Sequence, residues 1–137
     1  MALYDVFSIS GSALSAQSVR LNTVSSNLAN ADSASNSPEQ AYRARQPVFA
    51  AILSTVDANQ ASVGVRVAGI VESQEEIPRE YMPGNPLADR DGYVYKSNVN
   101  TVEEMANMIS ASRSYQNNIE VLNTSKQLLL KTLNLGR

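Results

Sequence analysis

Cysteine and histidine are absent from the 137 residues, and each absence removes a kind of chemistry. A chain without cysteine or histidine has no cysteine nucleophile, no Ser-His pair and no His/Cys metal site. It also forms no disulfide, which leaves its compartment open but allows an oxidising one. We therefore expect no catalytic residues and no metal ligands.

Charge and long apolar runs are scarce as well. Eleven basic and thirteen acidic residues give a net charge of −2, and Lys and Arg form no cluster, so no nucleic-acid partner is expected. No apolar run approaches the roughly 18 residues of a membrane span. The first 19 residues lack Lys and Arg and are interrupted by Ser and Gly, so we expect no cleaved signal peptide.

Acidic residues and glycines in the middle of the chain do not form a recognisable site. The six glycines never form a phosphate-binding loop, so we expect no cofactor and no small-molecule substrate. A calcium loop through Asp89 and Asp91 would need ligands where Leu87 and Asn98 stand. A solvated surface explains the neighbouring glutamates better than acid–base chemistry does. These glutamates are Glu72, Glu75, Glu76 and Glu80.

The last third of the chain, Thr101 to Leu135, predicts one long helix without Pro or Gly. Thr101 and Glu104 have the spacing of a capping box. Apolar residues then recur at steps of three and four, which is typical of a coiled-coil seam about 50 Å long. The predicted seam comprises Met105, Met108, Ile109, Tyr115, Ile119, Leu122, Leu129 and Leu133, interrupted by Ser112 and Lys126.

The first segment predicts a weaker helix that would pair with the last one. Its apolar residues lie seven apart, and Gly11 and several serines lower its helix propensity. Polar residues and a proline over 31–38 end the helix near Asn30. The seam residues predicted here are Leu14, Leu21, Val24 and Leu28.

Few charges lie on either predicted helix. Residues 1–30 carry two charges against twelve Ser, Thr, Asn and Gln, and residues 105–125 also carry two. One interpretation is an unusual composition in two ordinary helices. The other is that neighbouring subunits pack all round them, since small polar faces allow close approach. On that interpretation Ala111, Ser114 and Asn118 lie on the face opposite the seam and contact other subunits. Lys126 lies on the seam itself and is also expected to contact a neighbouring subunit.

The middle, residues 32–98, holds all five prolines and predicts short antiparallel strands. Residues 48–53 form an apolar run, and 63–68 alternate in the period of a half-buried strand, so a hairpin with a flexible tip is expected. Asp91-Gly92 before Tyr93 marks a second turn. The predicted fold is thus α+β: a helix over 1–31, a β region over 32–98 and a helix over 99–137, with the two helices forming one coiled-coil domain.

A family resemblance begins at the end of the first helix. Ser26, Asn27, Leu28, Ala29 and Asn30 match a signature that flagellar axial proteins, the rod and hook subunits, carry near the N-terminus. Further segments resemble the proximal rod proteins of this family. They are residues 42–44 with 48–49, 83–89 with 92–94, 109–116, 119–124, 131–133 and 135–136. One departure is Ser97, where these proteins commonly have proline.

The resemblance implies a structural subunit of the bacterial flagellar basal body. Such proteins build the drive shaft across the periplasm, and their terminal helices pair into an axial coiled coil around the export channel. The implied partners are other rod subunits, copies of the chain itself, the adaptor between rod and membrane ring, and the flagellar type III export gate. Two rival hypotheses are weaker. A membrane-surface amphipathic protein would need a basic helix face, and a small enzyme would need clustered titratable groups.

Overall fold

The computed structural model describes residues 3–53 and 63–136, which form two helices and five strands. This composition confirms the α+β class. The predicted flexible tip of the hairpin falls at 54–62, outside the described residues. The elements in chain order are α1 (Leu3–Ala29), β1 (Ala34–Ser35), β2 (Arg45–Leu53), β3 (Val63–Glu72), β4 (Arg79–Tyr81), β5 (Tyr93–Lys96) and α2 (Thr101–Leu135).

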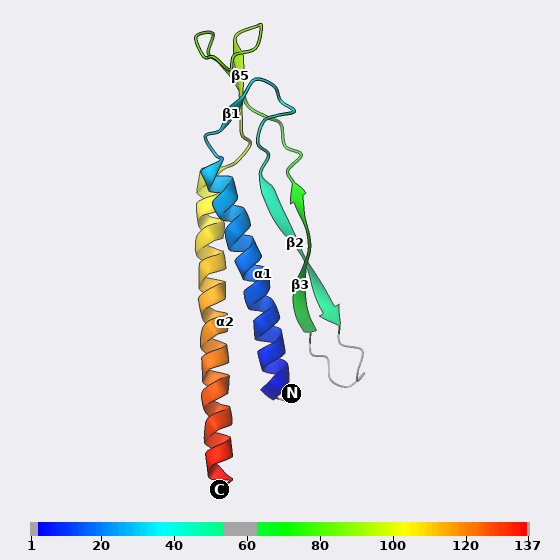
Figure 1. The fold of residues 1–137 in the computed structure, drawn as a ribbon, viewed down its shortest axis with the longest axis vertical. Helices are drawn as coiled ribbons and strands as arrows, with labels where there is room; N and C mark the ends of the chain where they lie inside the picture. The colour runs from blue at the N-terminus through cyan, green and yellow to red at the C-terminus, as the bar shows by residue number, and fades with distance from the viewer. Residues whose placement is uncertain (1–2, 54–62, 137) are drawn as a thin grey trace.

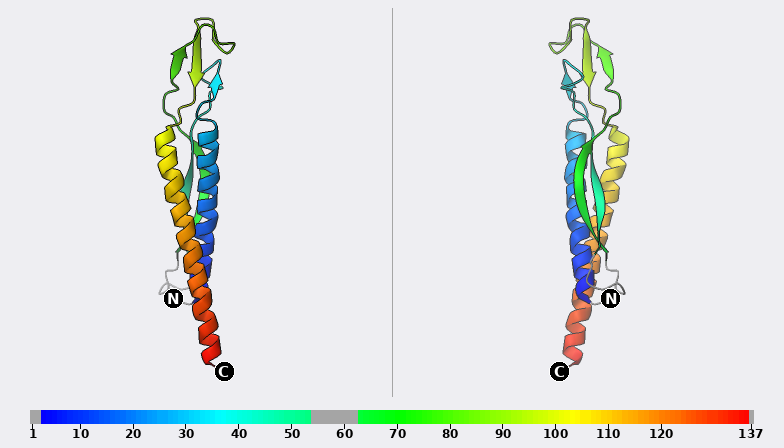
Figure 2. Two further views of the ribbon diagram at one scale, coloured as in Figure 1. Left: turned by 90° about the vertical axis from the view of Figure 1, so that its left-hand side faces the viewer. Right: turned by 90° about the vertical axis from the view of Figure 1, so that its right-hand side faces the viewer.

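The two helices lie side by side and run in opposite directions (Figures 1 and 2). α2 has the predicted bounds, and with 35 residues against 27 it extends past the N-terminal end of α1. The predicted capping box is wrong, because Asn100 is the N-cap and its side chain accepts from the N–H groups of Val102 and Glu103. Glu104 is thereby left for another partner.

The hairpin of β2 and β3 packs on α1 as a twisted ribbon. The pairing runs antiparallel from Arg45 opposite Glu72 to Leu53 opposite Val63 and slips once after Val48. Each strand contacts α1 through its outer edge, β2 at Asn27 and β3 at Ser12. Arg45 of β2 bonds Asn27 through its backbone N–H and C=O, and Val65 of β3 donates its N–H to Ser12 Oγ at 3.1 Å. Because the hairpin is twisted, β2 and β3 cross each other along α1, as Figure 1 shows.

A three-stranded sheet in the order β1-β5-β4 forms the end of the molecule farthest from the C-terminus. Asp89 holds the turn before β5: one carboxylate oxygen accepts from the N–H groups of Asp91 and Tyr93, and the other from Tyr95 Oη. These bonds, above all that from Tyr93 N–H, lower the pKa of Asp89. Gly92 has φ +83°, and a Cβ there would meet the Tyr81 ring at 2.8 Å.

The segment entering α2 is tied to the end of α1 by Ser97. Its N–H donates to Ser33 O at 3.2 Å, and its Oγ donates to Ala31 O at 2.7 Å. Proline, common here in the rod proteins, has no N–H to make the first bond. Serine in place of proline at position 97 thus adds two hydrogen bonds between the segment that follows β5 and the segment that follows α1.

Candidate assembly surfaces

Asn27, the second residue of the motif at 26–30, is the polar centre of the joint between α1, α2 and β2. Its side chain is fully buried. Nδ2 donates to Arg45 O at 2.8 Å and to Glu104 Oε2 at 2.9 Å. Oδ1 accepts from Arg45 N and Tyr42 Oη, both at 2.9 Å. Both donors and both acceptor positions of the amide are occupied, so this one side chain fixes three elements.

Glu104 extends the joint into α2. It is 4% exposed, and besides Asn27 it accepts from Asn107 Nδ2 at 3.5 Å. Asn107 Oδ1 in turn accepts from Arg20 Nη2 on α1 at 3.1 Å. A buried carboxylate is tolerated only when donors surround it, and here two side-chain amides supply them.

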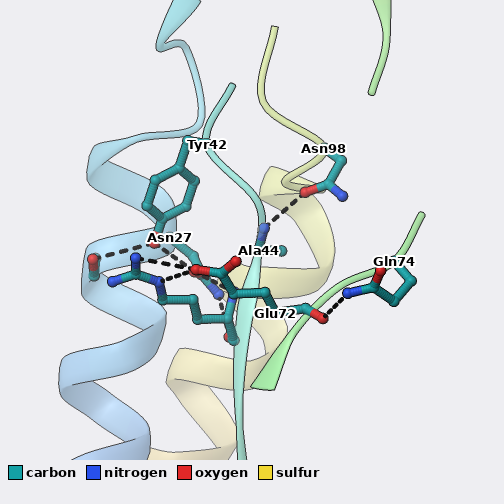
Figure 3. Close-up of polar contacts among 8 residues, drawn as sticks. Asn27, Tyr42, Ala44, Glu72, Gln74 and Asn98 are labelled. Carbon is teal, nitrogen blue, oxygen red and sulfur yellow. Dashed lines mark hydrogen bonds and ion pairs between the residues drawn. The ribbon is translucent and has the colours of Figure 1, made fainter. Parts of the chain in front are cut away.

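Aromatic and ionic contacts cover the joint on its β side, as Figure 3 shows. The Arg45 guanidinium lies 5.6 Å from the centre of the Tyr42 ring and 3.2 Å from a Glu72 carboxylate oxygen. Beside them Ala44 N donates to Asn98 Oδ1 at 2.7 Å, and Gln74 Nε2 donates to Glu72 O at 3.2 Å. The joint is thus braced from both strands of the hairpin and from the segment before α2.

The other residues of the motif support Asn27. Ser26 Oγ lies 3.2 Å from Tyr42 Oη, and Asn30 Nδ2 donates to Ser26 O at 2.8 Å, where it helps to end the helix. Leu28 is half-buried and Ala29 is exposed. From the sequence, these residues stood out only as a family signature, and the central role of Asn27 was missed. Glu104 lies seven residues before Ala111, in the same column of α2. This spacing was a sequence signal that Glu104 faces its own chain, where it meets Asn27.

The side of α2 turned to its own chain differs from the predicted seam. Half of the seam is placed on this side: Met108, Tyr115, Leu122 and Leu129 are half-buried. The other inner column is one residue earlier than predicted and is small or polar. It consists of Glu104, Ala111, Asn118 and Ser125.

Several predicted seam residues of α2 therefore lie outside, and for them the prediction is wrong. Met105 and Ile109 are each 56% exposed, and Ile119 and Leu133 are also exposed. The physical reason is the close approach to α1, which small side chains permit and bulky ones in that column would prevent. In α1 the predicted residues fit better, with Val24 buried and the others half-buried. Those others are Leu14, Leu21 and Leu28.

The predicted subunit-contact face is corrected in the same way. Ala111 is 0% exposed and therefore belongs to the inner side, not to the opposite face. Ser114 and Asn118 are half-buried, and Asn118 Nδ2 donates to Ser114 O within the helix. Lys126, placed on the seam from the sequence, is exposed. Its contact with a neighbouring subunit stays a prediction.

The outward surfaces of the two helices are of opposite kinds. α2 presents exposed bulky apolar residues: Val102, Met105, Ile109, Ile119, Val121, Leu128, Leu130, Leu133 and Leu135. α1 presents small residues at steps of three and four: Ser8, Gly11, Ser15, Ser18, Asn22, Ser25 and Ala29. Neither row contains a charged residue, which is unusual for surfaces that face only water.

Features that would support other kinds of site are few in the described residues. An open cleft of about 410 Å³ lies among α1, α2 and β2 and is lined in part by Arg20, Phe49 and Glu103. Over 3–53 and 63–136 there is no group of three metal-ligating side chains and no helix apolar enough to cross a bilayer. Of the four glutamates at 72, 75, 76 and 80, two are in ion pairs, Glu72 with Arg45 and Glu80 with Lys96.

Comparisons with known proteins agree with the signature at 26–30. Residues 7–34 match the family model "Flagella basal body rod protein", and residues 90–135 match "Flagellar basal body rod FlgEFG protein C-terminal". The chain is 58% identical to the flagellar basal-body rod protein FlgC of Salmonella typhimurium, over the full length of both. It is 55% and 53% identical to those of Escherichia coli O157:H7 and Yersinia enterocolitica, again over full length. The chain therefore belongs to the FlgC family of flagellar basal-body rod proteins, which are structural proteins and not enzymes.

Proposed function

We propose that this rod subunit belongs to the proximal part of the rod and assembles through its terminal helices into the shaft that carries torque across the periplasm. The observation that carries the proposal is the outward row of bulky residues on α2, including Met105 and Ile109 at 56% exposure. Such a row leaves apolar area in water in the single chain, and helices of neighbouring subunits would cover it. Residues 1–31 and 99–137 would act together as one axial coiled-coil domain around 32–98.

The outward side of α2 also supports a position beside the export channel. A polar strip separates Met105, Ile119 and Leu130 from Val121 on this side of the helix. It consists of Ser110, Arg113, Asn117, Glu120, Thr124 and Gln127, all exposed. A helix held by neighbours on both flanks would turn this strip toward water. We infer that the strip faces the channel through which later subunits pass, and that the chain itself leaves the cell through the flagellar type III export gate.

The hairpin supports contact with a second kind of partner. It packs on α1 and leaves apolar side chains uncovered on both strands, among them Phe49 on β2 and Ile70 on β3. Exposed apolar strands are normally covered in a finished assembly. The adaptor that joins the rod to the membrane ring, or an adjacent rod subunit, would cover this face.

Complementation of a deletion strain tests the proposal. Basal bodies isolated from cells carrying the wild-type chain should contain it in the rod, and Met105→Ser with Ile109→Ser should reduce both its amount there and swimming. The matched control is Ser110→Ala with Asn117→Ala on the polar strip, which should leave both unchanged. A wild-type chain absent from basal bodies would contradict the assignment to the rod. Normal incorporation of the Met105→Ser, Ile109→Ser variant would contradict the helix contacts.

A further inference from the structure

The two ends of α2 differ in charge and are both uncovered. At its start Val102 is 76% exposed beside Glu103, with Ile109 on the same side of the helix two turns on. We call these three residues the head patch. Near its end Leu128 and Leu135 are 53% and 87% exposed and flank Lys131. We call these three the tail patch. The head patch is apolar and acidic, and the tail patch is apolar and basic.

The tail patch lies on the part of α2 that continues beyond α1 (Figure 1). The inner column of α2 that packs on α1 also continues into this end, through half-buried Leu129 to exposed Leu133. The interface between the helices is therefore interrupted where α1 stops, and another helix could extend it. No acidic residue follows Glu120 in α2, so the whole end carries the charge of Lys126 and Lys131.

One chain cannot bring its own patches together. Glu103 and Lys131 are separated by 28 residues of continuous helix, which is about 42 Å. The two patches are different surfaces of one chain, so a contact between them is heterologous. Repeated between copies whose helices run parallel, such a contact gives a ring or an open helical array.

We propose that the tail patch of one copy of this chain docks on the head patch of a second copy, with Lys131 beside Glu103 and leucines against Val102 and Ile109. This inference rests on the proposed self-assembly and names the surfaces that perform it. Apolar contact supplies most of the attraction. The opposite charges select the head-to-tail orientation, because like ends would place acid on acid or base on base.

A charge exchange tests the contact. Glu103→Lys and Lys131→Glu each place like charges together, and each should lower incorporation into isolated basal bodies by up to about tenfold. The double variant should restore it. Both changes oppose the dipole of α2 itself, so helix stability cannot explain a recovery. The matched control is Glu103→Lys with Arg113→Glu, which has the same net charge as the exchanged pair and should not recover.

Cysteine pairs identify the occupant, since the chain has no cysteine of its own. Cells carrying both Val102→Cys and Leu135→Cys copies, one of them epitope-tagged, should give an oxidised product of two chains. Cells carrying only one variant should not. A crosslink to a different rod subunit, a product from either variant alone, or no recovery in the charge exchange would each overturn the proposal. In all three cases, wild-type chain in the rod would leave the assignment to the rod intact.

Discussion

The inner and outer sides of α2 reverse the usual arrangement of a helix in a globular protein. The inner side buries Glu104 and Ala111, whereas the outer side exposes Met105 and Ile109. A helix stabilised by one chain alone would bury its largest apolar residues. Here the small residues are used within the chain, where they let α1 approach, and the bulky ones remain free for contacts between chains. The difference between the two sides means that one chain alone buries only part of the apolar surface of α2, and that contacts between chains are left to bury the rest.

The largest expected effect is on the inner side, at Asn27. Asn27→Ala would leave Glu104, Tyr42 and both backbone groups of Arg45 without their partner. We expect a loss of roughly 3–5 kcal/mol in the free energy of unfolding, because each unsatisfied buried group costs about 1–3 kcal/mol. Urea unfolding followed by circular dichroism measures it. Asn22→Ala, on the exposed face of the same helix, should change stability by less than about 0.5 kcal/mol. Equal effects would show that the joint is not special.

A smaller effect is expected from size alone at Ala111. The side chain is fully buried, so Ala111→Leu should separate the helices at a cost of about 1–3 kcal/mol. Ala106→Leu adds the same atoms to an exposed position of α2 and is the control. Thermal unfolding of both variants distinguishes the sides. A stable Ala111→Leu chain would mean that close approach to α1 is not required.

A substitution on the outer side of α2 should impair assembly into basal bodies and leave the stability of the single chain almost unchanged. Ile109→Ser should alter the stability of the purified chain by less than about 0.5 kcal/mol, since its side chain is already exposed. Its recovery in basal bodies should nevertheless fall. Loss of stability in the free chain would show that Ile109 supports the fold, and the difference between the two sides would disappear.

The smallest effect lies outside α2 and marks where the comparison stops. Hydrogen bonds from Tyr93, Asp91 and Tyr95 lower the pKa of Asp89 from its ordinary value of 3.8. The ionised carboxylate therefore stabilises the turn fully at a pH above that ordinary pKa. The contribution is lost as the pH falls through the lowered folded pKa. Amide NMR shifts of Tyr93 should therefore move at acid pH. Asp89→Asn should abolish this response. A Tyr93 amide shift that still moves at acid pH in the Asp89→Asn variant would contradict the role of Asp89 in this turn.

Much of the framework could be predicted because it depends on local patterns. The bounds of α2, the end of α1 near Asn30 and the β2–β3 hairpin follow from capping, turn residues and periodicity, and the structure agrees. The orientation of α2 was half wrong. Its column at Met108 was identified, but the second column was assigned to bulky residues, whereas Glu104 and Ala111 occupy it. Periodicity finds a stripe but cannot tell whether its own chain or a neighbour covers it.

The joint at Asn27 was harder to predict for a related reason. A buried amide gives no apolar signal, and its partners Arg45 and Glu104 are 18 and 77 residues away in the chain. Only the family signature at 26–30 marked the position, and it did so without a physical role. The structure supplies that role through the four hydrogen bonds of one side chain.

The crossed attachment of the hairpin has a mechanical consequence. α1 holds the β2 edge at Asn27 and the β3 edge at Ser12, fifteen residues apart, or about 22 Å along the helix. A ribbon held through opposite edges at two levels is released from α1 only when the hydrogen bonds at both levels break. It also cannot untwist without stretching one of them. In a shaft that rotates under load, the hairpin would turn with α1 as one body, and torsion applied to its outer face would reach the helices without slack.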